Sequence, residues 1–380
     1  MMTKKLIYFI CAGLVALSSC KKDEEPDPPL PDPEEEMLNT VPEFYEEAVE
    51  DEYGIHPPEF EVLAGSPIIK DPWDLDFNFE RPDELWVINH SIESVGGSVT
   101  IFFEAGTDGQ SFERKTDGNA WHFMSLPSAI AFGDNGNFAT TTAVKDANHS
   151  GGTFTGPSLW SGDLSIFAEP SGGNGSHLDM LHGSPHSMGI AHEKDNVYWV
   201  YDGYHEHIVR YDFVDDHGPG NDYHGDALVH RYGDVEVKWN PDAPSHMILD
   251  KTSGWLYIAD NGNKRIIRMD INSGVKKSDL PLINEPLEEH WEMGDTKWEV
   301  FAETGLSAPA GIELVDNRLF VSDFDTGEII AYDTESKSEL ARISTGSAGI
   351  MGLKVGPDGK LWFVNQADDE LVRILPVQAE

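Results

Sequence analysis

The sequence contains six copies of one strand-and-turn pattern. In each copy a proline or small residue leads into a short apolar strand, a turn rich in Asp, Gly or Asn follows, a second strand ends in Asp or Asn, and a third strand comes next. The clearest copies begin at Ser184, Ala243, Ala308 and Ser347, and two degenerate copies begin at Asp71 and Leu126. No long stretch has the period of a helix. Repeats of this size, with three visible strands and a variable fourth, predict an all-β, six-bladed β-propeller.

The alternative for a chain of 380 residues is a β-sandwich, or two smaller β domains. The end of the second strand argues against this alternative, because an acid or amide recurs there in matched context. The recurring residues are Asp202, Asp260, Asp323 and Asn365. A sandwich would not repeat its strand and turn chemistry in this way. The propeller is therefore the better interpretation, and each of these side chains is expected to accept backbone hydrogen bonds in its own turn.

The order of the strands also predicts how the ring closes. The chain stops after a third strand at residues 371–375, so the last blade lacks its outer strand. FEVLAG at residues 60–65 is similar to WEVFAE at residues 298–303, which leads into the fifth copy. We expect the N-terminal strand to complete the sixth blade, because joining the two ends removes an open sheet edge.

The copies resemble the blades of NHL-repeat propellers, whose pattern combines Pro-x-Gly-Ile, a strand ending in Ala-Asp, and Asn-x-Arg-Ile. The best match is WLYIAD at residues 255–260 followed by NKRI at residues 263–266. The resemblance covers about residues 60–376 and is strongest in the last four copies. It is weaker in the first two, where the third strand of the second copy is expected at residues 162–167.

The first 20 residues have the features of a bacterial lipoprotein signal. Two lysines precede an apolar run at residues 6–17 that is too short to span a bilayer as a stable helix. LSSC at residues 17–20 resembles the lipobox, which implies cleavage before Cys20 and attachment of acyl chains such as palmitate to that cysteine. Cys11 falls in the discarded signal, so no thiol is left for a disulfide. An ordinary secretory signal with a chance cysteine is the alternative.

These features divide the chain into a signal peptide at residues 1–19, an acidic Pro-rich tether at residues 20–55 and a propeller at residues 56–380. The prolines and like charges of the tether keep it extended, and it has little apolar surface to bury. KKDEE at residues 21–25 resembles the acidic export tag of Bacteroidetes lipoproteins. That resemblance implies a lipid-anchored protein of the outer membrane that faces the cell exterior, whereas a plain solvated linker is the alternative.

The charge of the chain narrows the choice of partners. With 68 acidic and 26 basic side chains, the net charge is -42 at pH 7. So negative a surface repels phosphate backbones and anionic head groups, so we expect no nucleic-acid partner and contact with the membrane only through the lipid anchor. An acidic surface also serves solubility alone, so the charge by itself does not identify a ligand.

In a propeller, the loops that lead into the inner strands and the loops between second and third strands gather on one face, around a funnel. The candidates for lining this funnel are His90, Asp74, Tyr204, Asn261 and Asp325. Histidine is concentrated nearby, since ten of the 15 lie between residues 177 and 246, and neutral imidazole binds zinc and other transition metals. The candidate metal ligands are His186, His246, His182, His205 and His207. A metal-free funnel, in which histidines only donate and accept hydrogen bonds, is the alternative.

Two of the candidates come from adjacent blades and form the strongest pair, His186 and His246. PHSMGI at residues 185–190 and YDGY at residues 201–204 resemble the zinc-dependent peptidyl-hydroxyglycine lyase, a six-bladed NHL-type propeller. The resemblance implies a zinc ligand directly after the proline, which is the place of His186. The next blade departs from that pattern, because Ser245 follows the proline and His246 is displaced by one position. The lyase activity is thus in doubt, while a metal site of different geometry stays open.

An acidic loop at residues 215–226 predicts a second kind of site. Its oxygen-bearing residues are Asp215, Asp216, Asn221, Asp222 and Asp226. Oxygen ligands on a flexible loop suit calcium, but the spacing is not that of an EF-hand, and a plain acidic loop is an equal alternative. The strand-end acids could likewise imitate the carboxylates of calcium-dependent lactonase propellers, although a role within the turn is favoured.

The motifs of nucleophilic and nucleotide-dependent enzymes are missing from the sequence, which has no Gly-x-Ser-x-Gly, Walker or dinucleotide-binding glycine pattern. The leading hypothesis is a binding module that captures a small molecule, peptide or glycan at a His-lined funnel. In one version of this hypothesis the funnel contains a metal ion. The competing hypotheses are a metal-dependent lyase or hydrolase that uses the same histidines, and a scaffold without a small-molecule site. Propellers host all of these functions, so the fold alone does not choose.

Overall fold

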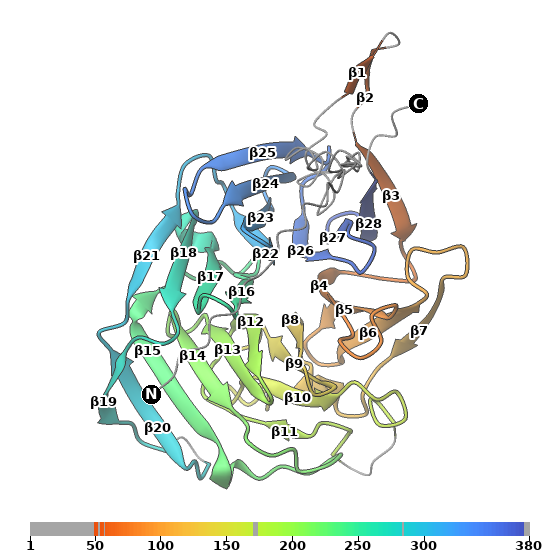
Figure 1. Ribbon diagram of the computed structural model, residues 1–380. Helices are drawn as coiled ribbons and strands as arrows, with labels where there is room; N and C mark the ends of the chain where they lie inside the picture. Colours follow the sequence, from red (N-terminus) through yellow and green to blue (C-terminus); the bar gives the residue numbers. More distant parts are fainter. Residues whose placement is uncertain (1–48, 52–53, 57, 170–173, 283–284, 376–380) are drawn as a thin grey trace, which may run out of the picture.

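The repeated strands form six small sheets that surround a central channel, as Figure 1 shows. The computed structural model describes residues 49–51, 54–56, 58–169, 174–282 and 285–375. Each blade has four antiparallel strands, of which the first lies nearest the channel. This arrangement confirms the predicted all-β, six-bladed propeller. The signal peptide, Cys20 and most of the tether lie outside the described residues.

The first three blades follow the chain in order. The first contains β4 (Pro72–Phe77), β5 (Leu85–Ile92), β6 (Gly96–Phe103) and β7 (Ser111–Lys115). The second contains β8 (Pro127–Phe132), β9 (Asn137–Thr142), β10 (Ser158–Ser161) and β11 (Asp179–Met180), preceded by the short helix α3 (Ala120–Phe123). The third contains β12 (Ser187–Lys194), β13 (Val197–Asp202), β14 (His207–Asp212) and β15 (Leu228–Glu236).

The other three blades complete the ring. The fourth contains β16 (Met247–Asp250), β17 (Trp255–Asp260), β18 (Arg265–Asp270) and β21 (Trp298–Ala302). The fifth contains β22 (Pro309–Val315), β23 (Arg318–Asp323), β24 (Glu328–Asp333) and β25 (Glu339–Ser344). The sixth contains β26 (Ile350–Val355), β27 (Leu361–Asn365), β28 (Glu370–Leu375) and, from the other end of the chain, β3 (Glu59–Ala64).

The ring closes as predicted, with the N-terminal strand as the outer strand of the last blade. β3 pairs antiparallel with β28, from Glu59 opposite Leu375 to Ala64 opposite Leu371. Arg373 Nη2 lies 2.6 Å from the Glu61 carboxylate across this pair. In the fourth blade β21 pairs with β18 in the same place, which confirms the similarity between residues 60–65 and 298–303.

Large aromatic side chains fill the spaces between neighbouring blades. Trp86, on the second strand of the first blade, is fully buried and contacts Phe132 and Phe138 of the second blade edge-on, with ring centroids 5.3 and 5.1 Å apart. Trp362 occupies the same strand of the sixth blade and meets Phe77 of the first blade at 5.5 Å. Aromatic pairs of this kind stabilise the packing beyond the area that they bury. These tryptophans therefore belong to the core and not to a sugar-binding surface.

Three features differ from the sequence prediction or add to it. The third strand of the second blade is β10, whereas residues 162–167 form a turn in which Asp163 accepts hydrogen bonds from the backbone and side chain of Ser165. An insertion between β18 and β21 forms β19 (Val275–Asp279) and β20 (Glu289–Gly294), and β20 pairs parallel with β15, so that the third sheet has six strands.

The third feature is a hairpin in the last part of the segment predicted as a tether. It consists of β1 (Val49–Asp51) and β2 (Gly54–His56), which pair with each other. Figure 1 shows this hairpin outside the ring. Among the described residues no helix has the length and apolar character needed to cross a membrane.

Removal of β3 tests the closure. A chain that begins at residue 66 should lose about five inter-strand hydrogen bonds, each worth roughly 1 kcal/mol, and its Tm should fall by roughly 10 °C. A chain that begins at residue 58 lacks the tether but keeps β3, and it should unfold at the same temperature as the parent. Thermal unfolding followed by circular dichroism measures both. Equal Tm values for the two truncated chains would show that β3 does not hold the ring.

Candidate functional site

A cavity of about 210 Å³ lies in the central channel and is lined by the inner strands of all six blades. Its charged and imidazole-bearing lining residues are Asp74, Asp76, His192, His246, Lys251 and Lys354. The lining continues to Phe79 and Lys251, which follow the ends of β4 and β16. The cavity therefore extends from the middle of the channel toward the face opposite the predicted funnel.

A buried lysine and two carboxylates form the charged centre of this channel. Lys354 Nζ lies 3.4 Å from Asp76 Oδ1 and 3.3 Å from Glu313 Oε2. Burial acts to lower the pKa of Lys354, but the Asp76 and Glu313 carboxylates outweigh it and raise that pKa above its ordinary value. Burial raises the pKa of Glu313, against the lowering influence of Lys354. The lysine therefore stays charged and holds two acids around it.

Asp74 and His246 lie one layer away in the same channel. Asp74 Oδ2 accepts a hydrogen bond from the Ile130 backbone at 2.9 Å, which fixes the carboxylate against the second blade. His246 Nδ1 is 3.6 Å from Asp74 Oδ1. Burial raises the pKa of Asp74, although the nearby His246 lowers it. Both residues line the cavity.

The other predicted funnel residues lie elsewhere and do not line the cavity. His90 is buried, stacks on Trp73 with ring centroids 3.9 Å apart, and bonds through Nδ1 to the Pro127 carbonyl at 3.1 Å. Asn261 is buried and donates to the Pro309 carbonyl at 2.9 Å. Tyr204 and Asp325 are exposed. Each of the two buried groups joins neighbouring blades.

The strongest predicted metal pair is not brought together around a common point. His186 Nδ1 is 2.7 Å from the Ala143 carbonyl, and its ring stacks on Trp239 at 4.6 Å. His246 Nε2 is instead 3.0 Å from the Ser128 carbonyl. Within the described part of the chain, the clusters of three potential metal ligands include neither imidazole. One nitrogen of each ring is thus engaged with a backbone oxygen.

His205 and His207 do gather with a carboxylate, Asp202, but an arginine already occupies the centre of the group. His205 Nδ1 is 2.7 Å from Asp202 Oδ2, and Arg231 Nη1 donates to the same carboxylate oxygen at 3.1 Å. Arg231 Nη1 also lies 3.3 Å from His207 Nε2. Burial lowers the pKa of His207 to about 4, so its ring is neutral and accepts this bond. A cation at this place would compete with the guanidinium.

The strand-end acids have the structural role favoured by the sequence. Asp323 accepts hydrogen bonds from the backbone of Ser307 at 2.6 Å and of Thr326 at 3.2 Å, so it joins its own turn to the loop that leads into the blade. Asp260 accepts from the Lys238 backbone at 2.8 Å and from Arg265 Nε at 2.6 Å. Both carboxylate oxygens of Asp260 and of Asp323 thus accept hydrogen bonds from groups within the fold.

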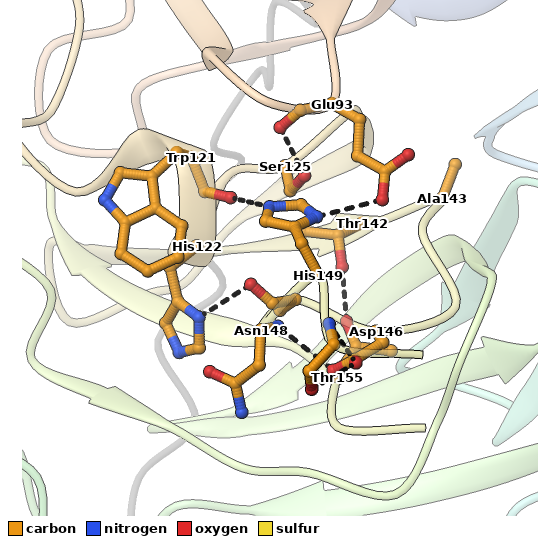
Figure 2. Close-up of polar contacts among 12 residues, drawn as sticks. Glu93, Trp121, His122, Ser125, Thr142, Ala143, Asp146, Asn148, His149 and Thr155 are labelled. Atoms are coloured by element: carbon orange, nitrogen blue, oxygen red, sulfur yellow. Dashed lines mark hydrogen bonds and ion pairs between the residues drawn. The ribbon is translucent and has the colours of Figure 1, made fainter. Parts of the chain in front are cut away.

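A further histidine clamps the loops beside the second blade, as Figure 2 shows. His149 Nδ1 lies 2.9 Å from Glu93 Oε1, and its Nε2 lies 2.8 Å from the Trp121 carbonyl. Because both partners are acceptors, both ring nitrogens carry protons when both bonds form. Partial burial acts to lower the pKa of His149, but the Trp121 carbonyl and Glu93 raise it. The contact ties the insert between β9 and β10 to the first blade.

The same insert is organised by Asp146, whose carboxylate accepts hydrogen bonds from the backbones of Asn148, Ser150 and Gly152 at 2.9 to 3.0 Å. Slight burial opposes the effect, but these donors lower the pKa of Asp146 to about 2. This loop is therefore a self-contained turn with a fixed carboxylate.

The predicted calcium loop does not gather its oxygens around one point in the described residues. Asp215, Asp216, Asn221 and Asp222 are exposed, whereas Asp226 turns inward toward His217. His182, the remaining candidate metal ligand, is buried and bonds through Nδ1 to Glu285 Oε2 at 2.5 Å.

Sequence reasoning missed Asp76, Glu313 and Lys354, which form the charged centre of the channel. A usable signal was present, because each residue follows the central apolar residue of its inner strand, which is Leu75, Ile312 or Leu353. Equivalent positions of the repeat meet at one height of the channel. Superposition of the six inner strands would have shown three charged residues in one layer.

Solved structures with the same architecture include an auxiliary nutrient binding protein from Bacteroides ovatus, which has 13% sequence identity and a TM-score of 0.54 over 84% of this chain and 74% of that chain. A calcium-binding protein from Agrobacterium tumefaciens, regucalcin, has 13% identity and a TM-score of 0.53 over 84% and 96%. A luciferin-regenerating enzyme has 10% identity and a TM-score of 0.53 over 84% and 96%.

The chain is a six-bladed β-propeller, and these solved structures share its architecture. No protein-family model matches the sequence, and no curated protein matches it either. Identities of 10% and 13% establish the shared architecture and leave the function to be argued from the site.

Replacement of the channel lysine tests the charged centre. Lys354→Met leaves the Asp76 and Glu313 carboxylates without their cation, so it should lower the free energy of unfolding by roughly 3 kcal/mol. The double variant Lys354→Met, Glu313→Leu removes one of the two carboxylate charges that lack a cation, and it should recover more than half of the lost stability. Denaturation in urea measures both.

The control is Lys238→Met, which breaks an exposed pair with Glu206 and should change stability little. If Lys354→Met is as stable as Lys238→Met, the lysine does not organise the channel.

Proposed function

We propose that this chain is a lipid-anchored protein of the cell surface whose propeller binds a small extracellular molecule in the central channel. The observation that carries the proposal is the 210 Å³ cavity, in which Asp74, Asp76 and Lys354 are presented together by the inner strands. Ligand sites are concave, mostly apolar and equipped with a few convergent polar groups. The channel has this composition, with Ile, Phe, Leu and Met side chains between the charged residues.

The charges of the channel indicate the chemistry of the ligand. Asp74, Asp76 and Glu313 outnumber Lys354, and the raised pKa values of Asp74 and Glu313 show that their buried charges lack full compensation. A cationic or hydroxyl-rich molecule would supply donors to these carboxylates. The volume suits a monosaccharide-sized or amino-acid-sized ligand, so a peptide or glycan would enter by one terminal unit. The nutrient binding protein with the same fold is consistent with this role.

The location rests on the sequence. The lipobox-like LSSC and the acidic stretch at residues 21–25 support a lipid anchor at Cys20 in the outer membrane and display toward the cell exterior. The net charge of -42 supports the expectation that nucleic acid is not a partner. Access to extracellular solutes would follow from this position.

A metal ion in the funnel receives less support than a metal-free channel. His186 and His246 each direct one ring nitrogen at a backbone carbonyl, and the contacts of His246 reach Asp74 instead of His186. The metal-dependent lyase or hydrolase would need these imidazoles to converge. Binding without catalysis is therefore the function that the geometry supports best, and calcium at the acidic loop stays a prediction.

The ligand can be found by thermal unfolding of the purified chain with sugars, amino acids and polyamines. A ligand at about 100 times its Kd should add roughly 2.7 kcal/mol to the free energy of unfolding, visible as a rise in Tm. Ala191→Met places a larger side chain in the cavity, and Asp76→Asn removes the charge of one carboxylate. Each variant should raise the Kd for the ligand by at least about tenfold, so the rise in Tm should shrink or disappear.

Asp325→Asn is the matched control, because Asp325 is an exposed carboxylate outside the cavity. It should bind as the parent does. A ligand that raises the Tm of Ala191→Met as much as that of the parent binds somewhere other than the channel, which would overturn the proposal.

The anchor is tested by its cysteine. Cys20→Ser should leave the protein without incorporated palmitate analogue and move it from the membrane fraction to the soluble fraction. Cys11→Ser is the matched control, since Cys11 lies in the signal that is removed, and it should keep both the label and the membrane location. Display is measured by adding protease to intact cells. Retention of label in Cys20→Ser would contradict the lipid anchor, and full protection from protease would contradict display.

A further inference from the structure

Three segments from different parts of the chain meet at the carboxylate of Glu285, at the outer edge of the second and third blades. His182 lies on the connection from β11 to β12. His224 lies in η1 (His224–Asp226), a single turn between β14 and β15. Glu285 lies on the part of the insertion that connects β19 to β20. None of the three residues lines the cavity of the channel.

The two imidazoles direct the same ring nitrogen at one carboxylate oxygen. His182 Nδ1 lies 2.5 Å and His224 Nδ1 lies 2.8 Å from Glu285 Oε2. The other oxygen, Oε1, accepts a hydrogen bond from the backbone N–H of His182 at 3.1 Å, which fixes the direction of the carboxylate. One potential ligand atom from each residue lies within 4.8 Å of those of the other two. The three side chains therefore converge on one point.

This convergence is buried and carries a negative charge. The exposed fractions of the side chains are 5% for His182, 4% for Glu285 and 14% for His224. Burial acts to raise the pKa of Glu285, but the hydrogen bonds from the two imidazoles outweigh it and lower that pKa to about 2. Within the described residues Glu285 pairs with these imidazoles and with no lysine or arginine, whereas Arg231 already pairs with Asp202. A metal ion would not compete with a guanidinium here.

His224 lies between two carboxylates, and a neutral ring cannot satisfy both. Its Nδ1 faces Glu285, and its Nε2 lies 3.5 Å from Asp179 Oδ1. A neutral imidazole has one N–H and donates to only one of them. His224 Nε2 and Asp179 Oδ2 are both buried without a hydrogen-bond partner, which is rare in folded proteins. Either the ring carries two protons, or a cation binds Nδ1 and the single proton lies on Nε2.

We propose that His182, His224 and Glu285 bind one zinc ion through the two Nδ1 atoms and the carboxylate. Two imidazoles and one carboxylate are a ligand set that zinc uses, with water in the fourth position. Each neutral ring keeps its one proton, which moves from Nδ1 to Nε2 when the ion binds. The ion lies outside the channel, and this proposal does not depend on the ligand-binding function.

Asp179 has the role of a positioning residue in this site. With zinc on Nδ1 of His224, the N–H on Nε2 faces Asp179 Oδ1 and can donate to it. Histidine ligands of metals almost always donate their other N–H to such an acceptor, and loss of the acceptor typically weakens metal binding by about 10- to 100-fold. The Asp179 side chain is fully buried, so it is fixed for this contact.

The ligand atoms need to move only a short distance to hold the ion. Two ligands that each lie about 2.0 to 2.2 Å from a tetrahedral zinc ion are about 3.4 Å apart. The present gaps of 2.5 and 2.8 Å are those of hydrogen bonds, so each has to widen by less than about 1 Å. His182 is held by its stack on Phe154, with ring centroids 3.5 Å apart. His224 belongs to a single turn on a loop, and we expect this residue to make most of the adjustment.

An ion at this place would fix the insertion to two blades. The insertion is attached through β20, which pairs parallel with β15, and through the Glu288 N–H, which donates to the Ala227 carbonyl at 3.0 Å. Zinc would join it at Glu285 to the loops that carry His182 and His224. Because β19 is the outermost strand of the six-stranded sheet, loss of the ion should loosen β19 and β20 before the blades.

The test is to strip the purified chain with a chelator, supply Zn²⁺, pass the protein through gel filtration and measure the bound zinc by mass spectrometry of the element. The parent should retain one zinc per chain, and chelation should lower its Tm and speed hydrogen exchange in β19 and β20. His182→Ala, His224→Ala and Glu285→Gln should each retain no zinc. Asp179→Asn should weaken zinc binding by about 10- to 100-fold in a competition with a chromogenic chelator.

The matched control is His205→Ala, His207→Ala, which removes two imidazoles from the group around Asp202 and should retain one zinc per chain. Should the His182, His224 variant fail to fold, Glu285→Gln and Asp179→Asn carry the test. A parent without stoichiometric zinc would show that His224 carries two protons instead, and would overturn the proposal. Zinc retained by Glu285→Gln, unchanged affinity in Asp179→Asn, or loss of zinc from the control alone would also overturn it.

Discussion

The hydrogen-bonded pairing of β3 with β28 is the constraint on which the rest of the molecule depends. It joins the two ends of the chain within one blade, and it sets the sixth blade against the first. The charged centre of the channel spans this same junction, since Lys354 comes from the sixth blade and Asp76 from the first. The junction that closes the ring therefore also brings together the charged residues of the candidate site.

Charge is used differently at three depths of the propeller. In the channel, carboxylates and a lysine are held in a low-dielectric space where their charges are only partly compensated. At the strand ends, Asp260 and Asp323 are fully satisfied by backbone donors and arginine. At the outer edge, Asp179 and its neighbouring histidines are buried without complete pairing. Incomplete compensation thus distinguishes the channel and this outer edge from the strand ends.

The sequence was sufficient for the features that repeat. The six copies predicted the blades, and the similarity of residues 60–65 to 298–303 predicted the closure, because equivalent segments of a repeat take equivalent places. Asp74 and His246 hold comparable entry positions in their repeats, and both line the cavity. The parallel pairing of β20 with β15 was not predictable in this way, since no other blade has a counterpart to it.

The surroundings of Asp179 could not be predicted for the same reason. Asp179 lies on β11, His217 lies on the connection between β14 and β15, and Glu285 lies on the insertion between β18 and β21. Only the docking of these segments brings them together. The histidine-rich composition of residues 177–246 suggested metal ligands, but it could not tell which of these histidines lie at the channel and which lie at the outer edge. The residue types alone point to candidate ligands, whereas contacts between segments far apart in the sequence decide where those side chains lie.

Because Glu59 stands opposite Leu375, the first and last strands of the ring are neighbours in space. A short covalent link between them could replace their separate ends, and new ends could then be opened in any exposed connection between blades. The propeller fold therefore does not depend on where along the ring the chain begins. The proposed lipid anchor would depend on it, because the blade to which the anchored end is joined would decide which mouth of the channel is turned toward the cell and which toward the surrounding medium.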